Sequence, residues 1–475
     1  MADDSRTSDH NPGEYDYASN KAAAVDYVVR EARDAGVRLV RCLWMDLSSV
    51  IRGRSVHVDV LRRHMLNGIG IPAAGMGLTT TDQQALPELP GQVRLLPDPS
   101  TFRLVPYASN AALMLGDLYE TDMQPWALCP RSNLKRVLAD LTDQGLRAQV
   151  GFETEFYFAV RTGEGNYVPV DESLYASSIG MTVAGKVINE IVDALDRQQV
   201  GIEGYQPKQG HGQQELVLLP ADPLTACDRL LLVREAVRSV AWSHGWYASF
   251  AAKPFEAQPA SSLQVRIGLR DRYDRSLLYQ PDAHRVRDDD VPCLSDETRW
   301  SMAGLMRHMP ALAAIACPTV NSYRRLQAQS PVPPLVTWGV DNRHTMLRVE
   351  PLSWQESDAN AGFEFKLADG SANPYLLLSG ILASFLDGLM NHYELPDATT
   401  GSPATIDPAE YAQRSIERLP PTLQAACDLL EKDPVLALAL GSPMQQAFLA
   451  VKRQEVKAFD GVIASTEQSR YYWKF

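Results

Sequence analysis

The sequence of 475 residues lacks several features that would place it in a common class. Its six cysteines are scattered without a CxxC pair, which argues against a disulfide or zinc framework and is typical of reduced cytoplasmic thiols. No apolar run approaches the ~20 residues of a membrane span, and the longest, residues 375–386, is interrupted by serine and glycine. The first 17 residues are polar and contain no apolar signal-peptide core. We therefore expect a cytoplasmic protein with no membrane partner.

An excess of positive charge is also missing. The chain has 45 Lys and Arg against 58 Asp and Glu, which gives a net charge of −13. A nucleic-acid-binding surface needs Lys and Arg clusters to neutralise phosphates, so we expect no nucleic-acid partner. Hydrophobic residues make up 45% of the chain and charged residues 22%, which is ordinary for a soluble globular protein and excludes disorder throughout.

Four common sequence motifs are absent as well. The chain contains no Walker A motif and no GxGxxG, which argues against a P-loop or Rossmann nucleotide site. It contains no GxSxG elbow and no HExxH, which argues against the common hydrolase classes. Any nucleotide or catalytic site must therefore be built from other residues.

The apolar patterns that are present predict an α+β protein with a small N-terminal unit and a large C-terminal one. Helical spacing predicts a helix over 19–35, and alternation predicts strands over 37–46 and 54–61. Strands and helices then recur to the end of the chain. The predicted units are a solvated, disordered tail at 1–17, an N-terminal domain at 18–127 and a second domain at 128–475. Strands are expected in the second domain at 146–160, 213–219, 246–253, 263–269, 345–350 and 362–367.

Acidic residues lie inside several of these apolar strands. Glu153 and Glu155 are two residues apart, so both project from one face of a strand, where they repel each other unless cations are nearby. Glu215 and Glu364 lie in two further strands of the same kind. Any one of them alone could be a solvent-facing residue of an edge strand, but the repetition favours a shared polar cavity. Carboxylates on rigid strands suit Mg²⁺ or Mn²⁺ with a phosphate-bearing substrate.

Arginines cluster in two later segments. Residues 317–326 contain Arg324 and Arg325, and residues 338–351 contain Arg343 and Arg348. Arginines at such spacing can bind phosphate or carboxylate oxygens in a bidentate manner. Without the carboxylates, surface or ion-pair arginines would be the better interpretation.

Seven segments together resemble the glutamine synthetase family, in the order and approximate spacing of that family. They are CLWMDLSSVIRGRSVHV, GFETEF, GQQEL, ASFAAKPF, PTVNSYRRL, NRHTMLRV and FEFKLADGSANPY, and the resemblance covers about residues 20–475. It implies an N-terminal β-grasp domain and a large catalytic domain of β-sheet and helices. It also implies a homo-oligomeric ring, a hexamer or dodecamer, in which neighbouring subunits share active sites. The implied chemistry uses ATP to convert a carboxylate into an acyl phosphate, which an amine attacks.

The resemblance also implies roles for individual residues. Metal-ligand positions match Glu153, Glu155, Glu215 and Glu364. The remaining matches are Glu203 on the nucleotide side, Arg325 on the substrate carboxylate, Arg343 and Arg348 facing phosphate, and Asp46 with Ser49 in the amine-site loop from the neighbouring subunit.

Several positions depart from the family pattern. Lys208 replaces a metal-binding glutamate, Gln264 and Arg266 replace two histidines, Pro259 and Ala260 replace Asn-Gly, Pro331 replaces a flap glutamate, Lys366 replaces a phosphate-binding arginine, and Gly362 replaces another arginine. We expect Arg266 and Lys366 to contact substrate. Each of the two metal sites implied by the resemblance loses one ligand, and positive charge is added. We therefore expect at least one Mg²⁺ or Mn²⁺ site, weaker or fewer than in the family, with ATP as co-substrate.

These departures make glutamine synthesis from glutamate and ammonia doubtful. The sequence predicts an ATP-dependent carboxylate–amine ligase that uses a small-molecule amine or carboxylic acid other than that pair. The alternative is a non-catalytic family member that keeps the ring scaffold for binding or regulation. A third possibility is a ligand-binding or hydrolytic relative with fewer metals. The retained glutamates and arginines favour chemistry, whereas Lys208, Gln264 and Pro331 favour the non-catalytic alternative.

Overall fold

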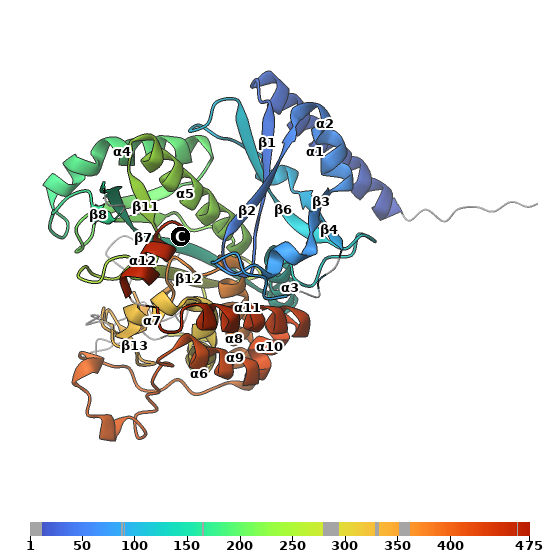
Figure 1. Cartoon of the computed structure of the whole chain (residues 1–475). Coiled ribbons are helices and arrows are strands. Elements are labelled where there is room, and N and C mark those ends of the chain that lie inside the picture. The colour runs from blue at the N-terminus through green and yellow to red at the C-terminus, as the bar shows by residue number, and fades with distance from the viewer. Residues whose placement is uncertain are drawn as a thin grey trace, which may run out of the picture.

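The computed structural model describes residues 12–475 except 87, 88, 90, 164–165, 279–293, 328–331, 351–361 and 463. It confirms the predicted α+β class, with a small sheet in the N-terminal part and a larger sheet covered by helices in the rest (Figure 1). The first helix, α1, spans Pro12–Asp34 and so begins inside the segment expected as a disordered tail. Extending an existing helix by a few polar residues costs little, because the unfavourable nucleation step is made elsewhere in the helix.

The N-terminal domain contains a six-stranded sheet with the order β2-β1-β6-β4-β3, and β5 pairs with β6. The central pair, β1 and β6, is parallel, and the other pairs are antiparallel. The elements are β1 (Leu39–Met45), β2 (Ile51–His57), α2 (Val58–Asn67), β3 (Ile69–Pro72), β4 (Gln92–Pro97), β5 (Arg103–Leu104) and β6 (Ala111–Tyr119), with 3-10 turns at Ala73–Gly77 and Pro99–Thr101.

The strand expected at 54–61 is partly wrong. β2 ends at His57, whose side chain accepts a hydrogen bond from Asp59 N and caps the helix α2. Val58, Leu61 and Met65 form the buried face of α2 at helical spacing. Because apolar residues continue to alternate up to residue 60, the expected strand included the first residues of α2.

The second domain contains a nine-stranded sheet with the order β13-β14-β15-β12-β7-β10-β9, and β8 and β11 also pair with β7. Its strands are β7 (Leu146–Arg161), β8 (Tyr167–Pro169), β9 (Ile202–Pro207), β10 (Gln213–Leu218), β11 (Tyr247–Ser249), β12 (Leu263–Asp271), β13 (Trp338–Val340), β14 (Leu347–Val349) and β15 (Phe363–Phe365). Its helices are α3 (Pro130–Asp143), α4 (Ser178–Arg197), α5 (Pro223–Ser243), α6 (Asp296–Ala316), α7 (Val320–Gln327), α8 (Pro374–Asn391), α9 (Leu423–Lys432), α10 (Pro434–Leu440), α11 (Ser442–Ala458) and α12 (Ala464–Tyr472), and 3-10 turns lie at Pro403–Thr405 and Pro408–Glu410.

Helices α6 and α8 to α11 lie together below the sheet in Figure 1. The pair α6 and α8 is packed backbone to backbone, because Gly304 and Gly388 meet at the crossing. A Cβ atom added to Gly304 would lie 2.2 Å from Ser384 O, so no larger residue fits without separating the helices. Both glycines are therefore required by close approach.

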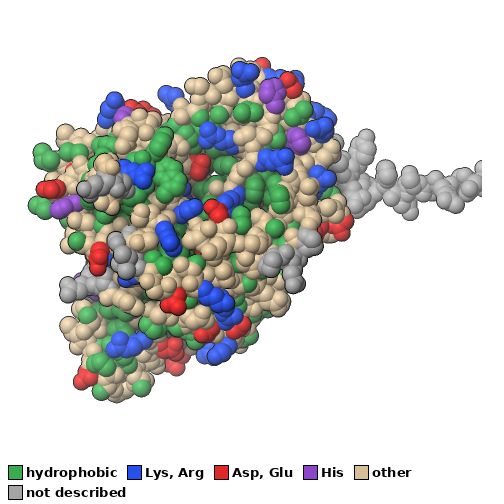
Figure 2. Space-filling view, viewed as in Figure 1, with side chains coloured by type: hydrophobic (Ala, Val, Ile, Leu, Met, Phe, Trp, Pro, Cys, Tyr) green, Lys and Arg blue, Asp and Glu red, His purple; other side chains and the backbone are tan. Residues whose placement is uncertain are grey.

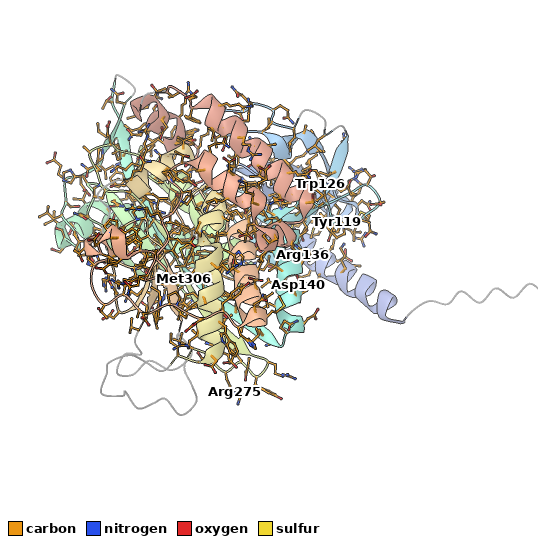
Figure 3. All side chains as sticks on the ribbon, turned by 90° about the horizontal axis from the view of Figure 1, so that it is seen from below. Tyr119, Trp126, Arg136, Asp140, Arg275 and Met306 are labelled. Carbon is orange, nitrogen blue, oxygen red and sulfur yellow. The ribbon has the colours of Figure 1, made fainter. Side chains whose placement is uncertain are left out.

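The link between the two domains folds back on itself. Trp126 N donates to Leu118 O, and Tyr119 pairs with Pro125, so residues 120–125 form a tight loop after β6. Figure 3 shows Tyr119 and Trp126 close together, with Arg136 and Asp140 farther along α3. α3 therefore begins beside the sheet of the N-terminal domain.

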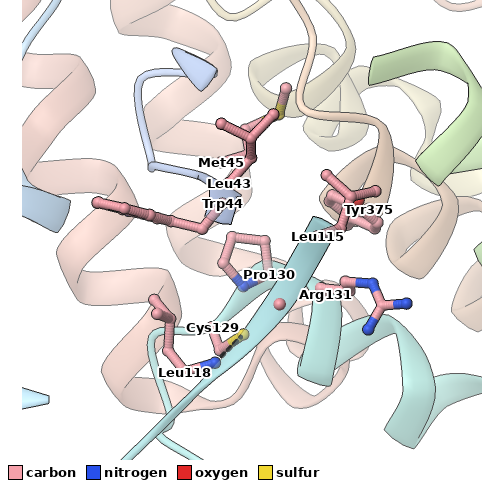
Figure 4. A pocket seen from close by; sticks show the side chains of 10 residues that line it. Leu43, Trp44, Met45, Leu115, Leu118, Cys129, Pro130, Arg131 and Tyr375 are labelled. Atoms are coloured by element: carbon pink, nitrogen blue, oxygen red, sulfur yellow. Dashed lines mark hydrogen bonds between the residues drawn. The ribbon is translucent and has the colours of Figure 1, made fainter. Parts of the chain in front are cut away.

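A buried ion network fixes this junction. Arg131 at the start of α3 donates to Asp98 (2.9 Å) and Asp117 (3.0 Å) of the N-terminal domain and to Asp228 (2.8 Å) of α5. Tyr375 of α8 donates its hydroxyl to Asp228 at 2.6 Å. A void of only about 10 Å³ remains beside these groups, with room for one water molecule at most (Figure 4). Arg131 thus holds elements of both domains in one closely packed junction.

A second buried contact joins α11 to the N-terminal domain. Glu455 accepts hydrogen bonds from Ser48 Oγ (3.2 Å) and Thr80 N (2.8 Å), and its other oxygen pairs with Lys452 at 2.9 Å. Both side chains of the Lys452–Glu455 pair are fully buried. The loop after β1 is therefore anchored to α11, near the C-terminus of the chain.

Aromatic side chains hold the C-terminal residues against the large sheet. Trp473 contacts Trp242 and Tyr247, and the Arg238 guanidinium lies over its ring. Hydrophobic side chains are visible near this end of the chain in Figure 2, and both tryptophans are about half exposed. Aromatic pairs of this kind add to the stabilisation from burial.

Two expectations about the whole chain can be compared with the described residues. No single described helix is long and apolar enough to cross a membrane; α10 and α11 reach that composition only as a pair bent by 102°. The five cysteines in the described ranges are buried, and no disulfide joins them.

A buried histidine links three helices of the helical layer. In α6, His308 Nδ1 lies 2.7 Å from Asp433 Oδ2 and Nε2 lies 2.9 Å from Asp387 Oδ2. Burial acts to lower the pKa of His308, but the hydrogen bonds with Asp433 and Asp387 outweigh it and raise the pKa above the ordinary 6.5. The imidazolium form therefore stabilises the fold.

We expect Arg131→Met to lower the free energy of unfolding by about 3–5 kcal/mol, because three aspartates would lose their buried cation. Denaturant titration followed by circular dichroism measures this change. Arg62→Met is the matched control, since its ion pair with Asp26 is more than half exposed and should contribute nothing measurable. Equal stability of the two variants would contradict the role given to Arg131.

We expect the stabilisation by His308 to depend on pH. Because its pKa is raised in the folded state, its contribution is fully present below the unfolded value of 6.5 and is lost as the pH rises through the folded value. The melting temperature of the wild type should exceed that of His308→Gln most at about pH 6 and least at about pH 9. A difference that grows with pH would show that the neutral imidazole is the stabilising form.

Candidate active site

A cavity of about 880 Å³ opens over one face of the nine-stranded sheet. Almost all the side chains that the sequence predicted for the site line it. They are Glu153, Glu155, Glu203, Glu215, Arg266, Arg325, Arg343, Arg348, Glu364 and Lys366. Asp46 does not line this cavity.

Strand register brings these residues together. Glu215 of β10 lies opposite Glu155 of β7, and Gln264 of β12 lies opposite Glu153. Glu364 of β15 lies opposite Arg266 on one side and Arg348 on the other. Directly opposed residues on neighbouring strands have Cβ atoms about 4.5–5.5 Å apart, so carboxylates and cations interleave across the sheet.

Lys208, immediately after β9, joins two of the glutamates. Its Nζ lies 3.2 Å from Glu155 Oε1 and 2.8 Å from Glu215 Oε2. Gln206 donates to the other oxygen of Glu215, and Ser262 N donates to Glu155 Oε2 at 2.7 Å. Burial raises the pKa of Glu155 although Lys208 opposes this, and burial lowers the pKa of Lys208 less than Glu155 and Glu215 raise it. We conclude that the ammonium is firmly held.

Glu364 has two cationic partners. Arg348 Nη1 donates to Glu364 Oε2 at 3.1 Å, and Lys366 Nζ lies 3.3 Å from the same oxygen. Lys366 also donates to Arg343 O at 3.1 Å. Burial lowers the pKa of Lys366, and the nearby Arg348 adds to this effect while Glu364 opposes it.

Arg266 is the cation nearest Glu153. Its Nη1 lies 3.0 Å from Glu203 Oε2 but 4.0 Å from Glu153 Oε1, and its Nε lies 3.5 Å from Glu350 Oε2. Burial and the neighbouring Glu364 and Glu215 raise the pKa of Glu153 to about 7. Of the four predicted metal ligands, Glu153 is therefore the one whose negative charge is least neutralised by a nearby cation.

Arg325 and Arg324 lie in different environments, although they are adjacent in α7. Arg325 lines the cavity and donates to Leu367 O, and within the described residues its Nε has no hydrogen-bond partner. Arg324 faces away and binds both oxygens of Glu467 in α12. Of the two, only Arg325 is placed to bind a ligand in the cavity.

Asp46 is fully buried in the loop after β1. It accepts hydrogen bonds from Ser48 N and Val50 N at 2.9 Å and from Arg52 Nε at 2.7 Å. Burial raises its pKa to about 6, although Arg52 opposes the shift. Its place in the active site of a neighbouring subunit stays a prediction.

The positions that depart from the family pattern are also located. Lys208, Gln264, Pro259 and Ala260 line the cavity, whereas Pro331 lies outside the described residues. A Cβ atom at Gly362 would lie 2.6 Å from Ile267 O, so no side chain fits there without moving the backbone of β12. The arginine expected from the resemblance at this position is therefore excluded by packing.

The metal site expected from the sequence stays a prediction. Nowhere in the described ranges do three or more Asp, Glu, His or Cys side chains come together as metal ligands. Glu155, Glu215 and Glu364 are each paired with Lys208, Arg348 or Lys366 instead. With these ion pairs in place the residues do not fit two protein-bound metal ions, and no chemical step is assigned to such an ion below. The cavity lining contains seven cationic side chains and six carboxylates, a balance that suits an anionic ligand.

Sequence reasoning missed several polar residues of the cavity. Gln206 and Gln213 provide amides beside Glu215 and Glu155, and Lys253 provides a further cation. The strand β9 that carries Gln206 was not predicted from the apolar patterns, although the resemblance placed Glu203 at the start of a strand. Its one signal in the sequence is the placement of Glu203, Gln206 and Lys208 among small and apolar residues, which is too irregular to indicate a strand.

Two family models match the chain. "Glutamine synthetase N-terminal domain" matches residues 23–126, and "Glutamine synthetase, catalytic domain" matches residues 127–471. Similar curated proteins include glutamine synthetase of Halobacterium salinarum, at 29% identity over 96% of this chain and 97% of that protein. Gamma-glutamylpolyamine synthetase GlnA3 of Streptomyces coelicolor is 27% identical over 94% of this chain and 95% of that protein.

Solved structures give the same result. A crystal structure described as a novel glutamine synthase homolog has a TM-score of 0.81 and 29% identity, covering 92% of this chain and 99% of that chain. A GmaS/ADP complex has a TM-score of 0.80 and 27% identity, covering 93% of this chain and 98% of that chain.

Proposed function

Because the chain belongs to the glutamine synthetase family through both its N-terminal and its catalytic domain, we propose that it is an ATP-dependent carboxylate–amine ligase with a substrate pair other than glutamate and ammonia. The observation that carries this proposal is the single cavity in which nearly all the charged residues implied by the family resemblance converge. Buried charges are costly to maintain, so their convergence favours a ligand of matching charge.

The cations at one side of the cavity suit the phosphates of ATP. Arg343 and Arg348 would contact phosphate oxygens, with Arg266 and Lys366 beside them, and Glu203 would lie on the nucleotide side. Arginine binds phosphate in a bidentate geometry, and a fixed cation is already oriented when charge develops. Mg²⁺ or Mn²⁺ would enter with the triphosphate as part of the substrate.

The reaction proposed for this site has two steps. The γ-phosphoryl group of ATP passes to a carboxylate oxygen of the acid, which gives an acyl phosphate and ADP. The amine nitrogen then attacks the acyl carbon, the carbon–oxygen bond to phosphate breaks, and the nitrogen loses a proton. Arg325 would hold a carboxylate of the acid, because its guanidinium is a buried cation that lines the cavity.

The substrate pair is proposed to differ from glutamate and ammonia because the polar groups around the cavity differ from the family pattern. Pro259 and Ala260 offer no side-chain hydrogen bonds to an α-amino group, and Pro331 has no ionisable group to pair with ammonium. We infer a bulkier or less polar amine, or an acid without an α-amino group. The similarity to a gamma-glutamylpolyamine synthetase supports variation of the amine within this fold.

The ion pairs within the cavity favour one alternative. Lys208, Arg348 and Lys366 already neutralise three of the glutamates, as expected if the site had lost its metals and its chemistry. On this alternative the chain is a non-catalytic family member that binds a ligand or regulates another process from the same scaffold.

The ligase proposal predicts phosphate release from ATP that depends on one acid and one amine. A panel of acids and amines is assayed for released phosphate, and we expect activity to be greatest with a pair other than glutamate and ammonia. Arg325→Ala should lower kcat/KM on the order of a hundredfold. Arg299→Ala, which removes an exposed arginine of α6 outside the cavity, is the matched control.

Two results would contradict the proposal. Greatest activity with glutamate plus ammonia would show that the substrate pair is the ordinary one. Measurable ATP binding without phosphate release across the whole panel would favour the non-catalytic alternative.

The proposal also includes a cytoplasmic ring of six or twelve chains, in which Asp46 and Ser49 serve the site of a neighbouring subunit. Asp46 lies outside the cavity of its own chain and is fully buried in the loop after β1. Light scattering at micromolar concentration should give the mass of a hexamer or dodecamer. A stable monomer would leave Asp46 without the site proposed for it.

A further inference from the structure

Lys208 is held in place from both ends. Lys208 N donates to Gln213 O at 2.8 Å, which extends the pairing between β9 and β10 by one residue. At the other end its ammonium lies between Glu155 and Glu215, and the side chain is 18% exposed. The ammonium is therefore a fixed part of the cavity wall rather than a mobile surface group.

The four carboxylate oxygens of this pair all have donors. Glu155 Oε1 and Glu215 Oε2 bind Lys208, Glu155 Oε2 accepts from Ser262 N, and Glu215 Oε1 accepts from Gln206. A divalent cation binds through the lone pairs of such oxygens. It would have to displace Lys208 to reach both carboxylates at once.

Electrostatic repulsion also prevents a metal ion from binding beside Lys208. Two carboxylates side by side repel each other and need a cation between them. The ammonium supplies one positive charge at 2.8–3.2 Å from both groups. Because it also repels any second cation at this short distance, the ammonium and a metal ion are mutually exclusive between Glu155 and Glu215.

We propose that the Lys208 ammonium is a tethered cation that takes the place of a divalent metal ion between Glu155 and Glu215. The protein thus keeps this part of its cavity assembled in the absence of any metal. The proposal adds detail to the site of the proposed function. One consequence rests on that function: a nucleotide would bring with it the metal ion that it needs. Lys208 is accordingly a positioning residue, which acts by orienting the two carboxylates.

The proposal is tested by titrating nucleotide-free protein with Mn²⁺ and counting bound ions by electron paramagnetic resonance. The variants are Lys208→Glu, which adds a third carboxylate, and Lys208→Met, which removes the charge at similar length. We expect each variant to bind one more Mn²⁺ per chain than the wild type, with affinity raised at least about tenfold and more strongly in Lys208→Glu. Adding Glu155→Gln to either variant should abolish the gain.

Lys186→Glu is the matched control, because it makes the same charge change at an exposed position of α4. It should leave Mn²⁺ binding unchanged. Circular dichroism establishes that each variant is folded, and Lys208→Met gives the answer if Lys208→Glu does not fold. Both variants failing to fold would itself agree with a Lys208 that holds the two carboxylates together.

A folded Lys208→Met protein with no additional Mn²⁺ would overturn the proposal. So would a wild-type protein that binds Mn²⁺ at a site abolished by Glu215→Gln but not strengthened by either Lys208 variant. Because the measurement needs neither ATP nor turnover, it stands whether or not the chain is a ligase. Failure of the ligase assay and failure of this test are therefore separate results.

Discussion

Five glutamates on strands of the large sheet line the cavity, and their charged forms can share one face only if cations lie among them. They are Glu153, Glu155, Glu203, Glu215 and Glu364. This constraint organises the catalytic domain. Carboxylates in a partly buried cavity repel one another, so their charged forms persist only beside positive groups. The strand register places these groups opposite one another on neighbouring strands, as with Arg266 and Arg348 on either side of Glu364. At the β9 edge, Lys208 neutralises Glu155 and Glu215 in the same way. The cavity is therefore assembled before any ligand arrives.

The same pairing decides how a ligand can bind. A phosphate that approaches Arg348 meets a guanidinium already bonded to Glu364, so the ligand must join an existing network. Each phosphate contact then contributes less binding free energy than a contact with an isolated arginine would. The side chains of the cavity, however, need no rearrangement when the ligand binds. Glu153 differs, since its nearest cation is 4.0 Å away and its pKa is raised to about 7. It is the carboxylate whose charge state a ligand can change most easily.

The apolar patterns allowed the α+β class to be predicted, and acidic residues two apart in an apolar strand indicated a shared polar face. The roles of most other cavity residues were implied by the family resemblance. The apolar patterns did not indicate β9, which lies at the sheet edge and pairs irregularly with β10 near Val217 and Leu218. The resemblance placed Lys208 near the predicted metal ligands, but the apolar patterns gave no indication of its contact with Glu155 and Glu215. The apolar pattern placed Asp46 at the end of a strand and the resemblance placed it in a loop; β1 ends at Met45, one residue before it. The partners that accompany its complete burial are Arg52 and neighbouring backbone N–H groups. Such contacts arise from tertiary packing, which no local pattern encodes.

The junction at Arg131 has a consequence for how the chain comes apart. Asp98 and Asp117 belong to one domain, whereas Arg131 and Asp228 belong to the other. If the domains separated, two aspartates would remain close together without their cation, and Arg131 would keep only one of three partners. Cutting the loop at 120–125 would therefore leave the two pieces bound to each other. The junction therefore couples the two domains, because separating them would leave buried charges without their partners.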